Sequence, residues 1–139
     1  MREHSIQVRV RYSETDQMGV VYHGNYIPYF EIGRVEWLRA QGVSYKSLEE
    51  GGIALPIVQM TLNYKKPARY DDLLNIKTRY KSQSSVKLEF ECEISSESGE
   101  LLTTAYFLLV FVDVKSARPI APPKYIREIL DRVESHSNP

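Results

Sequence analysis

Alternating apolar and polar residues predict five strands along this chain. The first covers residues 6–12, where apolar side chains at the even positions alternate with Gln7, Arg9 and Arg11. Residues 86–94 alternate in the same way with lysine and glutamate, which predicts a strand with one face in water. The other strands are expected at residues 57–64, 73–80 and 101–114, and the last of these is apolar on both faces from Ala105, as in a central strand.

Residues 25–42 have helical spacing instead. Four of them fall on one helical stripe, namely Tyr26, Phe30, Gly33 and Trp37. Asn25 is suited to cap the start of this helix, and Gly42 is suited to end it. Because a glycine inside a helix costs up to about 1 kcal/mol relative to alanine, we expect another backbone to approach closely at Gly33.

The order of elements is strand, helix, then four strands joined by short turns, with a short final helix over residues 123–133. This order predicts an α+β fold, with an antiparallel sheet of about five strands packed against one long helix. We expect one domain over residues 1–134 and a polar C-terminal tail over residues 135–139. Because the final strand is apolar on both faces in so small a chain, the sheet is expected to continue across a dimer.

Composition limits the expected partners and the expected cellular compartment of the protein. Eighteen basic residues balance eighteen acidic ones, which argues against a nucleic-acid partner or an anionic-membrane surface. The single cysteine, Cys92, has no partner for an internal disulfide, as is usual in a reducing compartment. The longest apolar run, residues 105–112, is far shorter than the ~20 residues that span a bilayer. Since the first ten residues also have no signal-peptide core, we expect a cytoplasmic protein with no integral membrane segment.

The loop between the first strand and the helix holds the candidate chemistry. Asp16 and His23 lie just before the helix N-terminus, where free backbone N–H groups and a partial positive charge can polarise a carbonyl. A carboxylate beside such a site can attack the carbonyl or activate a water. The residue pattern alone also leaves open that Asp16 forms a turn and that His23 is structural.

Two motifs resemble the signature of the 4-hydroxybenzoyl-CoA thioesterase family. The core of the first, within VRYSETDQMGVVYHGNYIPYFEIGRVEWLR, is T-D-x-x-G-V-V-Y-H-x-x-Y at residues 15–26, and the second is QMTLNYKKPARYDDLL at residues 59–74. The likeness covers about residues 6–125 and looks closest to bacterial acyl-CoA thioesterases associated with the Tol–Pal envelope genes. It implies the hotdog fold, in which a sheet wraps around one long helix.

The resemblance implies hydrolysis of an acyl-CoA or acyl-carrier-protein thioester to acid and thiol, without a metal or cofactor. Asp16 is the implied catalytic carboxylate, as nucleophile or as general base. The backbone N–H of His23 is the implied oxyanion donor, with Gly24 as the alternative because the helix cap is expected at Asn25. The His23 side chain is expected to hydrogen-bond the thioester or to orient Asp16. Substrate contacts are expected from Tyr22, Gly24, Val58, Gln59, Lys65 and Arg118.

The resemblance also implies a homo-oligomer, a dimer of dimers whose sheets join and whose thioester site lies at the dimer interface. A rival function is a non-catalytic hotdog module that binds acyl carrier protein or a partner in envelope biogenesis. The intact Asp16 argues against this rival, because binding alone does not require a carboxylate there.

Other charged residues have less specific interpretations. Glu31 and Arg34 are spaced for a surface ion pair, which we favour over a catalytic helix glutamate. The basic segments at residues 65–69 and 114–118 are suited either to coenzyme A phosphates or to solvated strand ends. Asp71 and Asp72 are expected in a turn before the next strand rather than at a metal.

Overall fold

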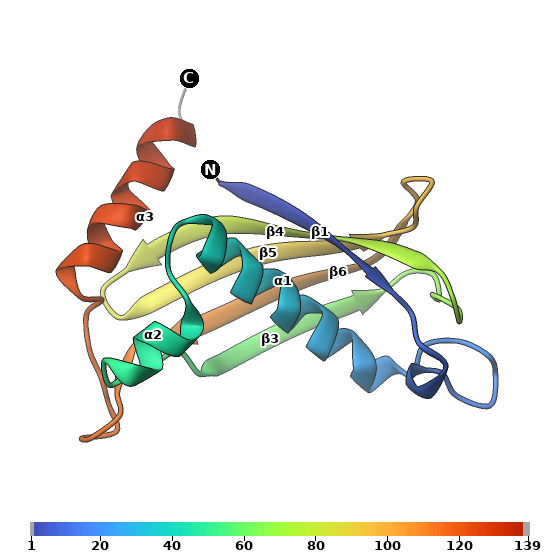
Figure 1. Cartoon of the computed structure of the whole chain (residues 1–139), viewed down its shortest axis with the longest axis horizontal. Helices are drawn as coiled ribbons and strands as arrows, with labels where there is room; N and C mark the ends of the chain where they lie inside the picture. Colours follow the sequence, from blue (N-terminus) through green and yellow to red (C-terminus); the bar gives the residue numbers. More distant parts are fainter. Residues whose placement is uncertain (1, 138–139) are drawn as a thin grey trace.

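The computed structural model of the chain describes residues 2–137. One long helix, α1 (Tyr26–Ala40), lies across one face of a five-stranded antiparallel sheet with the order β1-β4-β5-β6-β3 (Figure 1). The predicted α+β fold is therefore confirmed. The five strands are β1 (Glu3–Arg9), β3 (Ile57–Tyr64), β4 (Leu73–Ser84), β5 (Lys87–Ser95) and β6 (Leu101–Val110).

Several short elements were not predicted. Two-residue strands are too short to show alternation, and three of them form a small separate sheet in the order β2-β7-β8. The helix α2 follows α1 directly, and its start is capped by Ser44, whose hydroxyl accepts from the N–H of Ser47 at 3.0 Å. The short elements are β2 (Ile53–Ala54), β7 (Val112–Asp113), β8 (Arg118–Pro119), α2 (Tyr45–Glu50) and the 3₁₀ turns η1 (Tyr12–Glu14) and η2 (His23–Asn25).

Aromatic side chains join α1 to the sheet. Trp37 stacks on Tyr80 of β4 with ring centroids 5.8 Å apart, and Phe30 contacts Phe107 of β6 at 5.5 Å. All four rings are buried, as the helical stripe predicted for Phe30 and Trp37. The helix ends at Ala40, and Gly42 serves as its stop as expected, because its φ of 92° is a conformation that glycine adopts without strain.

Gly33 lies at the closest contact between α1 and β4. A Cβ atom at this position would lie 2.8 Å from Oγ1 of Thr78 and 2.9 Å from Cγ2 of Ile76. The close approach expected from the sequence is therefore present, but side chains of β4 make it, and the expectation of a backbone contact was wrong. Glycine is required there because buried β-branched side chains fill the space.

We expect Gly33→Ala to lower the free energy of unfolding by about 1–3 kcal/mol, the usual cost of overpacking a core. The helix propensity of alanine would recover only up to about 1 kcal/mol of this. Urea denaturation at neutral pH measures the difference. Gly51→Ala is the matched control, because its Cβ would contact only carbonyl oxygens at 3.4 Å. Equal stability of the two variants would contradict this account of Gly33.

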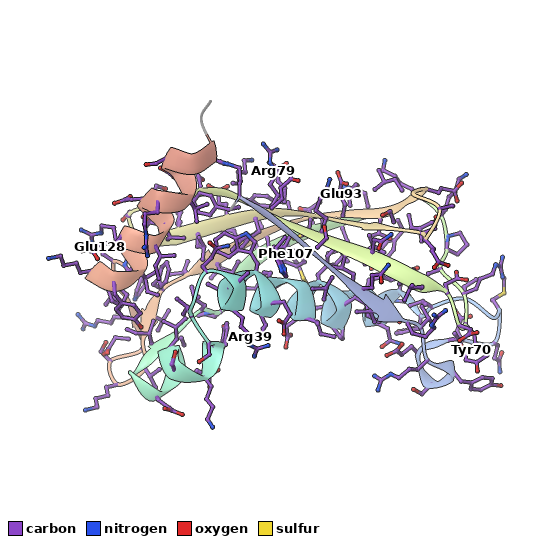
Figure 2. All side chains as sticks on the ribbon, turned by 45° about the horizontal axis from the view of Figure 1, so that its top comes forward. Arg39, Tyr70, Arg79, Glu93, Phe107 and Glu128 are labelled. Atoms are coloured by element: carbon purple, nitrogen blue, oxygen red, sulfur yellow. The ribbon has the colours of Figure 1, made fainter. Side chains whose placement is uncertain are left out.

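The sheet face opposite α1 is polar. Lys77 pairs with Glu93 at 3.5 Å, and Arg79 pairs with Glu3 at 3.6 Å. Figure 2 shows Arg79 and Glu93 projecting from this side of the sheet. The alternation along β5, with Leu88, Phe90, Cys92 and Ile94 buried toward the helix, confirms the predicted strand with one wet face.

The strand β3 is an edge strand that lacks protection. Its sequence, IVQMTLNY, has no charged residue and no proline, and it is paired with β6 on one side only. Val58 and Met60 are 58% and 44% exposed on it. Soluble monomers usually protect such an edge with charges or prolines. The final long strand, β6, lies between β5 and β3, as expected for a central strand, and β3 is the edge strand at which the sheet could continue.

Three predicted boundaries were also wrong. β1 ends at Arg9, and Tyr12 is 76% exposed in a 3₁₀ turn, because the N–H of Val10 already bonds to a loop carbonyl. β6 ends at Val110 rather than at residue 114, where the chain turns into the small sheet. The last helix, α3 (Lys124–Ser137), includes residues 135–137 of the expected tail. Within residues 2–137 no helix is long and apolar enough to cross a bilayer.

Candidate active site

Asp16 lies in a tight turn that returns the chain toward the helix. Its backbone N–H donates to the carbonyl of Val20 at 2.9 Å, and its Oδ1 accepts from the N–H of Met18 at 2.9 Å. One carboxylate oxygen of Asp16 therefore stabilises the turn, as the residue pattern had left open. The other oxygen, Oδ2, has no hydrogen-bond partner among residues 2–137, so it remains available for chemistry.

A cavity of about 300 Å³ lies between this turn, the start of the helix and the end of β3. The cavity brings together three residues expected from the sequence, Asp16, His23 and Lys65. Two tyrosines that line it, Tyr26 and Tyr64, were not named as site residues, although both fall within the quoted motifs. The pairing of β3 with β6, which has no local sequence signal, brings Tyr64 to the cavity, where it meets Tyr26 at the start of α1.

The helix start provides two unpaired backbone donors beside Asp16. The helical segment begins with η2, in which the N–H of Asn25 donates to the carbonyl of Tyr22 at 2.8 Å. The N–H groups of His23 and Gly24 precede the first bond of this turn, and neither has an acceptor among residues 2–137. His23 also lines the cavity. Free donors at a helix start beside a carboxylate can hold the oxyanion that forms when a carbonyl is attacked.

Asn25 occupies the expected N-cap position of α1, but the expected capping by its side chain was wrong. Its side chain makes no capping bond, and Nδ2 donates instead to the backbone carbonyl of Glu14 at 2.9 Å. The 3₁₀ turn before α1 moves the first free N–H groups two residues toward the N-terminus. His23 and Gly24, which the sequence left as alternative oxyanion donors, therefore both lie at the start of the helical segment. The N–H groups of both residues are unpaired within residues 2–137.

Tyrosines hold His23 in place. The hydroxyl of Tyr64 donates to the backbone carbonyl of His23 at 2.9 Å, and the ring of Tyr22 lies 4.2 Å from the imidazole, measured between centroids. Tyr26 accepts from the N–H of Ala68 at 3.2 Å. Burial raises the pKa of Tyr26 and of Tyr64, so both hydroxyls are protonated at neutral pH and can donate hydrogen bonds.

Glu14 fixes the loop to the helix. Its Oε1 accepts from the hydroxyl of Tyr29 at 2.7 Å and from the N–H of Arg11 at 2.8 Å, and its Oε2 lies 2.8 Å from Nη2 of Arg11. Its backbone carbonyl accepts from the N–H of Tyr22 at 2.9 Å. Burial acts to raise the pKa of Glu14, but these hydrogen bonds and the charge of Arg11 together hold it below its ordinary value.

We expect Glu14→Gln to lower the melting temperature by several degrees at pH 7, because a lost charge-assisted network costs on the order of 1–3 kcal/mol. A carboxylate whose pKa is lowered by folding stabilises the protein above its unfolded pKa of ~4.3, and this stabilisation is lost as the pH falls through the folded pKa. The gap between wild type and variant should therefore narrow as the pH falls below about 4.3 and through the lowered folded pKa of Glu14. Glu97→Gln, at an exposed glutamate, is the control with no gap at any pH. A gap independent of pH would contradict this role of Glu14.

The remaining predicted substrate contacts lie away from this cavity within one chain. Val58 and Gln59 lie near the start of β3, about 17–20 Å along the strand from Tyr64 at ~3.3 Å per residue. Arg118 is exposed on β8, in the small sheet that adjoins the start of β3 through β2. A single protomer thus brings Lys65 to Asp16 and leaves these three residues at the opposite end.

The structure confirms the expected turn at Asp72 but not the expected ion pair of Glu31 with Arg34. Asp72 lies in the expected turn, where its Oδ2 accepts from the N–H of Arg69 at 2.9 Å. The expected surface pair of Glu31 with Arg34 was wrong, because Arg34 is buried against the sheet and forms no ion pair within residues 2–137. Helical spacing places two residues on one side of a helix but does not determine which of them faces the core.

Known proteins share both the sequence and the fold. The family described as the thioesterase-like superfamily matches residues 10–130. The acyl-CoA thioester hydrolase YbgC of Escherichia coli O6:H1 is 40% identical over 119 residues, which cover 86% of this chain and 89% of YbgC. The acyl-CoA thioesterase YbgC of Haemophilus influenzae is 32% identical over 124 residues, covering 88% and 90%. The crystal structure of a DHNA-CoA thioesterase from Staphylococcus aureus has a TM-score of 0.93 at 33% identity, covering 99% of this chain and 95% of that one. The chain belongs to the thioesterase-like superfamily of hotdog-fold thioester hydrolases.

Proposed function

We propose that this protein hydrolyses acyl-CoA thioesters with Asp16 as its catalytic carboxylate. The observation that carries the proposal is the cavity lined by both Asp16 and His23, in which the backbone N–H of His23 has no acceptor among residues 2–137. The names of the two YbgC relatives support coenzyme A as the carrier. The two motifs quoted above also support placing the chain in the Tol–Pal-associated branch.

In the proposed reaction the thioester carbonyl oxygen accepts hydrogen bonds from the N–H groups of His23 and Gly24. An Asp16 oxygen attacks the carbonyl carbon, and the negative charge that develops on the carbonyl oxygen is stabilised by these donors. The carbon–sulfur bond then breaks, and coenzyme A leaves as a thiolate that takes a proton from solvent. Water hydrolyses the resulting mixed anhydride, which returns Asp16 as a carboxylate and releases the acid.

The cavity also suggests how coenzyme A is held. Lys65 and Lys66 follow the end of β3, where both backbone N–H groups donate to the carbonyl of Leu102 at 2.8 and 3.1 Å. The amine of Lys66 is paired with Glu100 at 2.9 Å. Lys65 has no carboxylate partner within residues 2–137 and is the proposed contact for a coenzyme A phosphate.

We propose that two copies of the chain pair through their β3 edges. Antiparallel pairing would satisfy the backbone groups of β3 that face solvent and would cover its exposed apolar side chains. The absence of charge on β3 supports a partner with the same apolar surface, which a second copy provides. We also propose that two such dimers associate into a dimer of dimers.

Release of free thiol from a panel of acyl-CoAs and acyl carrier protein thioesters tests the function. We expect turnover of at least one acyl-CoA, detected with a thiol reagent. Absence of thiol release from every member, with the protein folded and dimeric, would instead favour a binding module.

A single turnover in oxygen-18 water, with enzyme in excess, tests whether Asp16 acts as the nucleophile. A carboxylate is a weak base toward water, whereas its direct attack on a thioester expels a good leaving group. We therefore expect solvent oxygen in the peptide that carries Asp16, measured by mass spectrometry. The matched control is the peptide that carries Asp71, which should stay unlabelled. If label enters only the released acid, direct attack followed by hydrolysis at the Asp16 carbonyl is excluded.

A further inference from the structure

A second cavity, of about 370 Å³, lies beside the later part of α1 and the start of β3. Arg34 lines it and is only 7% exposed. Its guanidinium carbon lies 4.6 Å from the ring centroid of Phe107, which is labelled in Figure 2 beside α1. Nη1 of Arg34 is buried and has no hydrogen-bond partner among residues 2–137. A buried charged donor without a partner is costly, so Nη1 is expected to bond a water, an ion or a bound ligand.

The other walls of this cavity indicate what would fill it. Val35, Leu55 and Ile57 are apolar, and the hydroxyl of Tyr45 is already used in a bond to the carbonyl of Leu55 at 3.0 Å. An apolar wall with one convergent donor suits a hydrocarbon group that ends in an oxygen acceptor.

The rim of the cavity restricts the charge of that acceptor. Glu31 and Glu49 line it and are exposed. Their two negative charges outweigh the single charge of Arg34, so a neutral oxygen is favoured over a carboxylate. A terminal hydroxyl meets both conditions, because it accepts from Arg34 and can donate to a carboxylate at the rim.

Two-fold pairing of β3 brings this cavity to the active site of the other copy. Met60, Leu62 and Tyr64 face the helix side, opposite the buried residues of β6. Directly paired residues of an antiparallel sheet point to the same side, so a two-fold axis must pass at a residue, and pairing centred on β3 sets it at Met60 or at Thr61. Either position sets Tyr64, which lines the Asp16 cavity, opposite Pro56 or Val58 of the partner subunit. These residues flank Ile57, which lines the Arg34 cavity.

We infer that the Arg34 cavity holds the distal end of an acyl group whose thioester lies at Asp16 of the partner subunit, and that Arg34 hydrogen-bonds a terminal hydroxyl there. The inference rests on the proposed thioesterase function and on β3 pairing. It also accounts for Val58 and Gln59, which lie far from Asp16 in their own chain and close to it across the two-fold axis.

Matched substrates test the role of Arg34. Hexanoyl-, octanoyl- and decanoyl-CoA are each compared with the acyl-CoA that carries a hydroxyl on the last carbon, and adipoyl-CoA serves as the carboxylate control. We expect the hydroxylated member of at least one pair to have a kcat/KM about 10- to 100-fold higher, as for a hydrogen bond to a charged donor. Arg34→Met should bring this ratio close to one. Arg34→Lys keeps the cation and should retain part of the preference, which also provides a test if the methionine variant does not fold.

Mixed dimers test whether the cavity acts across the interface. A chain with Asp16→Asn and a chain with Arg34→Met are co-expressed with different tags, and the dimer that carries both tags is purified. If Arg34 serves the partner's Asp16, one site of this dimer is fully wild type, and the mixed dimer should show the wild-type ratio at about half the wild-type activity. If Arg34 serves its own chain, the only site with Asp16 lacks Arg34, and the ratio stays near one, which would overturn the assignment across the interface.

Failure of the inference can be told apart from failure of the proposed function. A wild-type enzyme that hydrolyses both members of every pair equally keeps the thioesterase function and overturns the role of Arg34. A higher kcat/KM for adipoyl-CoA than for 6-hydroxyhexanoyl-CoA would overturn the choice of a neutral acceptor. A wild-type enzyme that hydrolyses no acyl-CoA would overturn both.

Discussion

Replacing Asp16 with asparagine should lower kcat by at least about 100-fold, the lower end expected for the loss of a catalytic carboxylate. Asparagine keeps the side-chain oxygen that accepts from the N–H of Met18, so the turn should persist. What is lost is the charge and nucleophilicity of the carboxylate. Thiol release under saturating acyl-CoA measures kcat, and the far-UV circular dichroism spectrum should match that of the wild type.

Asp71→Asn is the matched control for this substitution. Asp71 lies in an exposed loop with φ of 70°, a conformation that asparagine tolerates as well as aspartate. It does not line the Asp16 cavity. We expect wild-type kcat for this variant. Near-normal turnover of Asp16→Asn would remove Asp16 from the catalytic role, and the N–H groups of His23 and Gly24 would then need another partner in catalysis.

Replacing Met60 with glutamate should separate the two copies and abolish most of the activity. Met60 lies near the middle of β3, so two-fold pairing would bring two carboxylates close together. Like charges facing each other across an interface cost several kcal/mol, which corresponds to a dissociation constant weakened by about 100-fold or more. Light scattering at micromolar concentration should show a dimer or tetramer for the wild type and a monomer for the variant.

The matched control introduces the same charge elsewhere. Tyr125 is 49% exposed on α3 and lies outside β3, so Tyr125→Glu should keep both the assembly and the activity. A wild-type chain that is monomeric at micromolar concentration would contradict the proposed pairing. A folded, monomeric and fully active Met60→Glu variant would show that each protomer has a complete site, against the arrangement inferred for the Arg34 cavity.

The sequence predicted those features whose signal is local. Alternation along residues 86–94 predicted β5 and its wet face, and the stripe that contains Phe30 and Trp37 predicted the buried face of α1. Both signals repeat every two or every three to four residues, so each can be detected within a single element. Asp16 and His23 could be paired in advance for the same reason, because one short loop carries both.

The tertiary structure alone decided the features that depend on contacts between distant segments. The pairing of β3 with β6 places Tyr64 beside His23, 41 residues earlier in the chain, and makes β3 rather than β6 the unprotected edge. The same pairing buries Phe107 beneath α1, where its ring contacts the guanidinium of Arg34. Helical spacing alone had assigned Arg34 to a surface ion pair. Periodicity determines which side chains of one element share a face. Which element covers that face, and which polar atom is left there without a partner, is determined by packing over the whole chain.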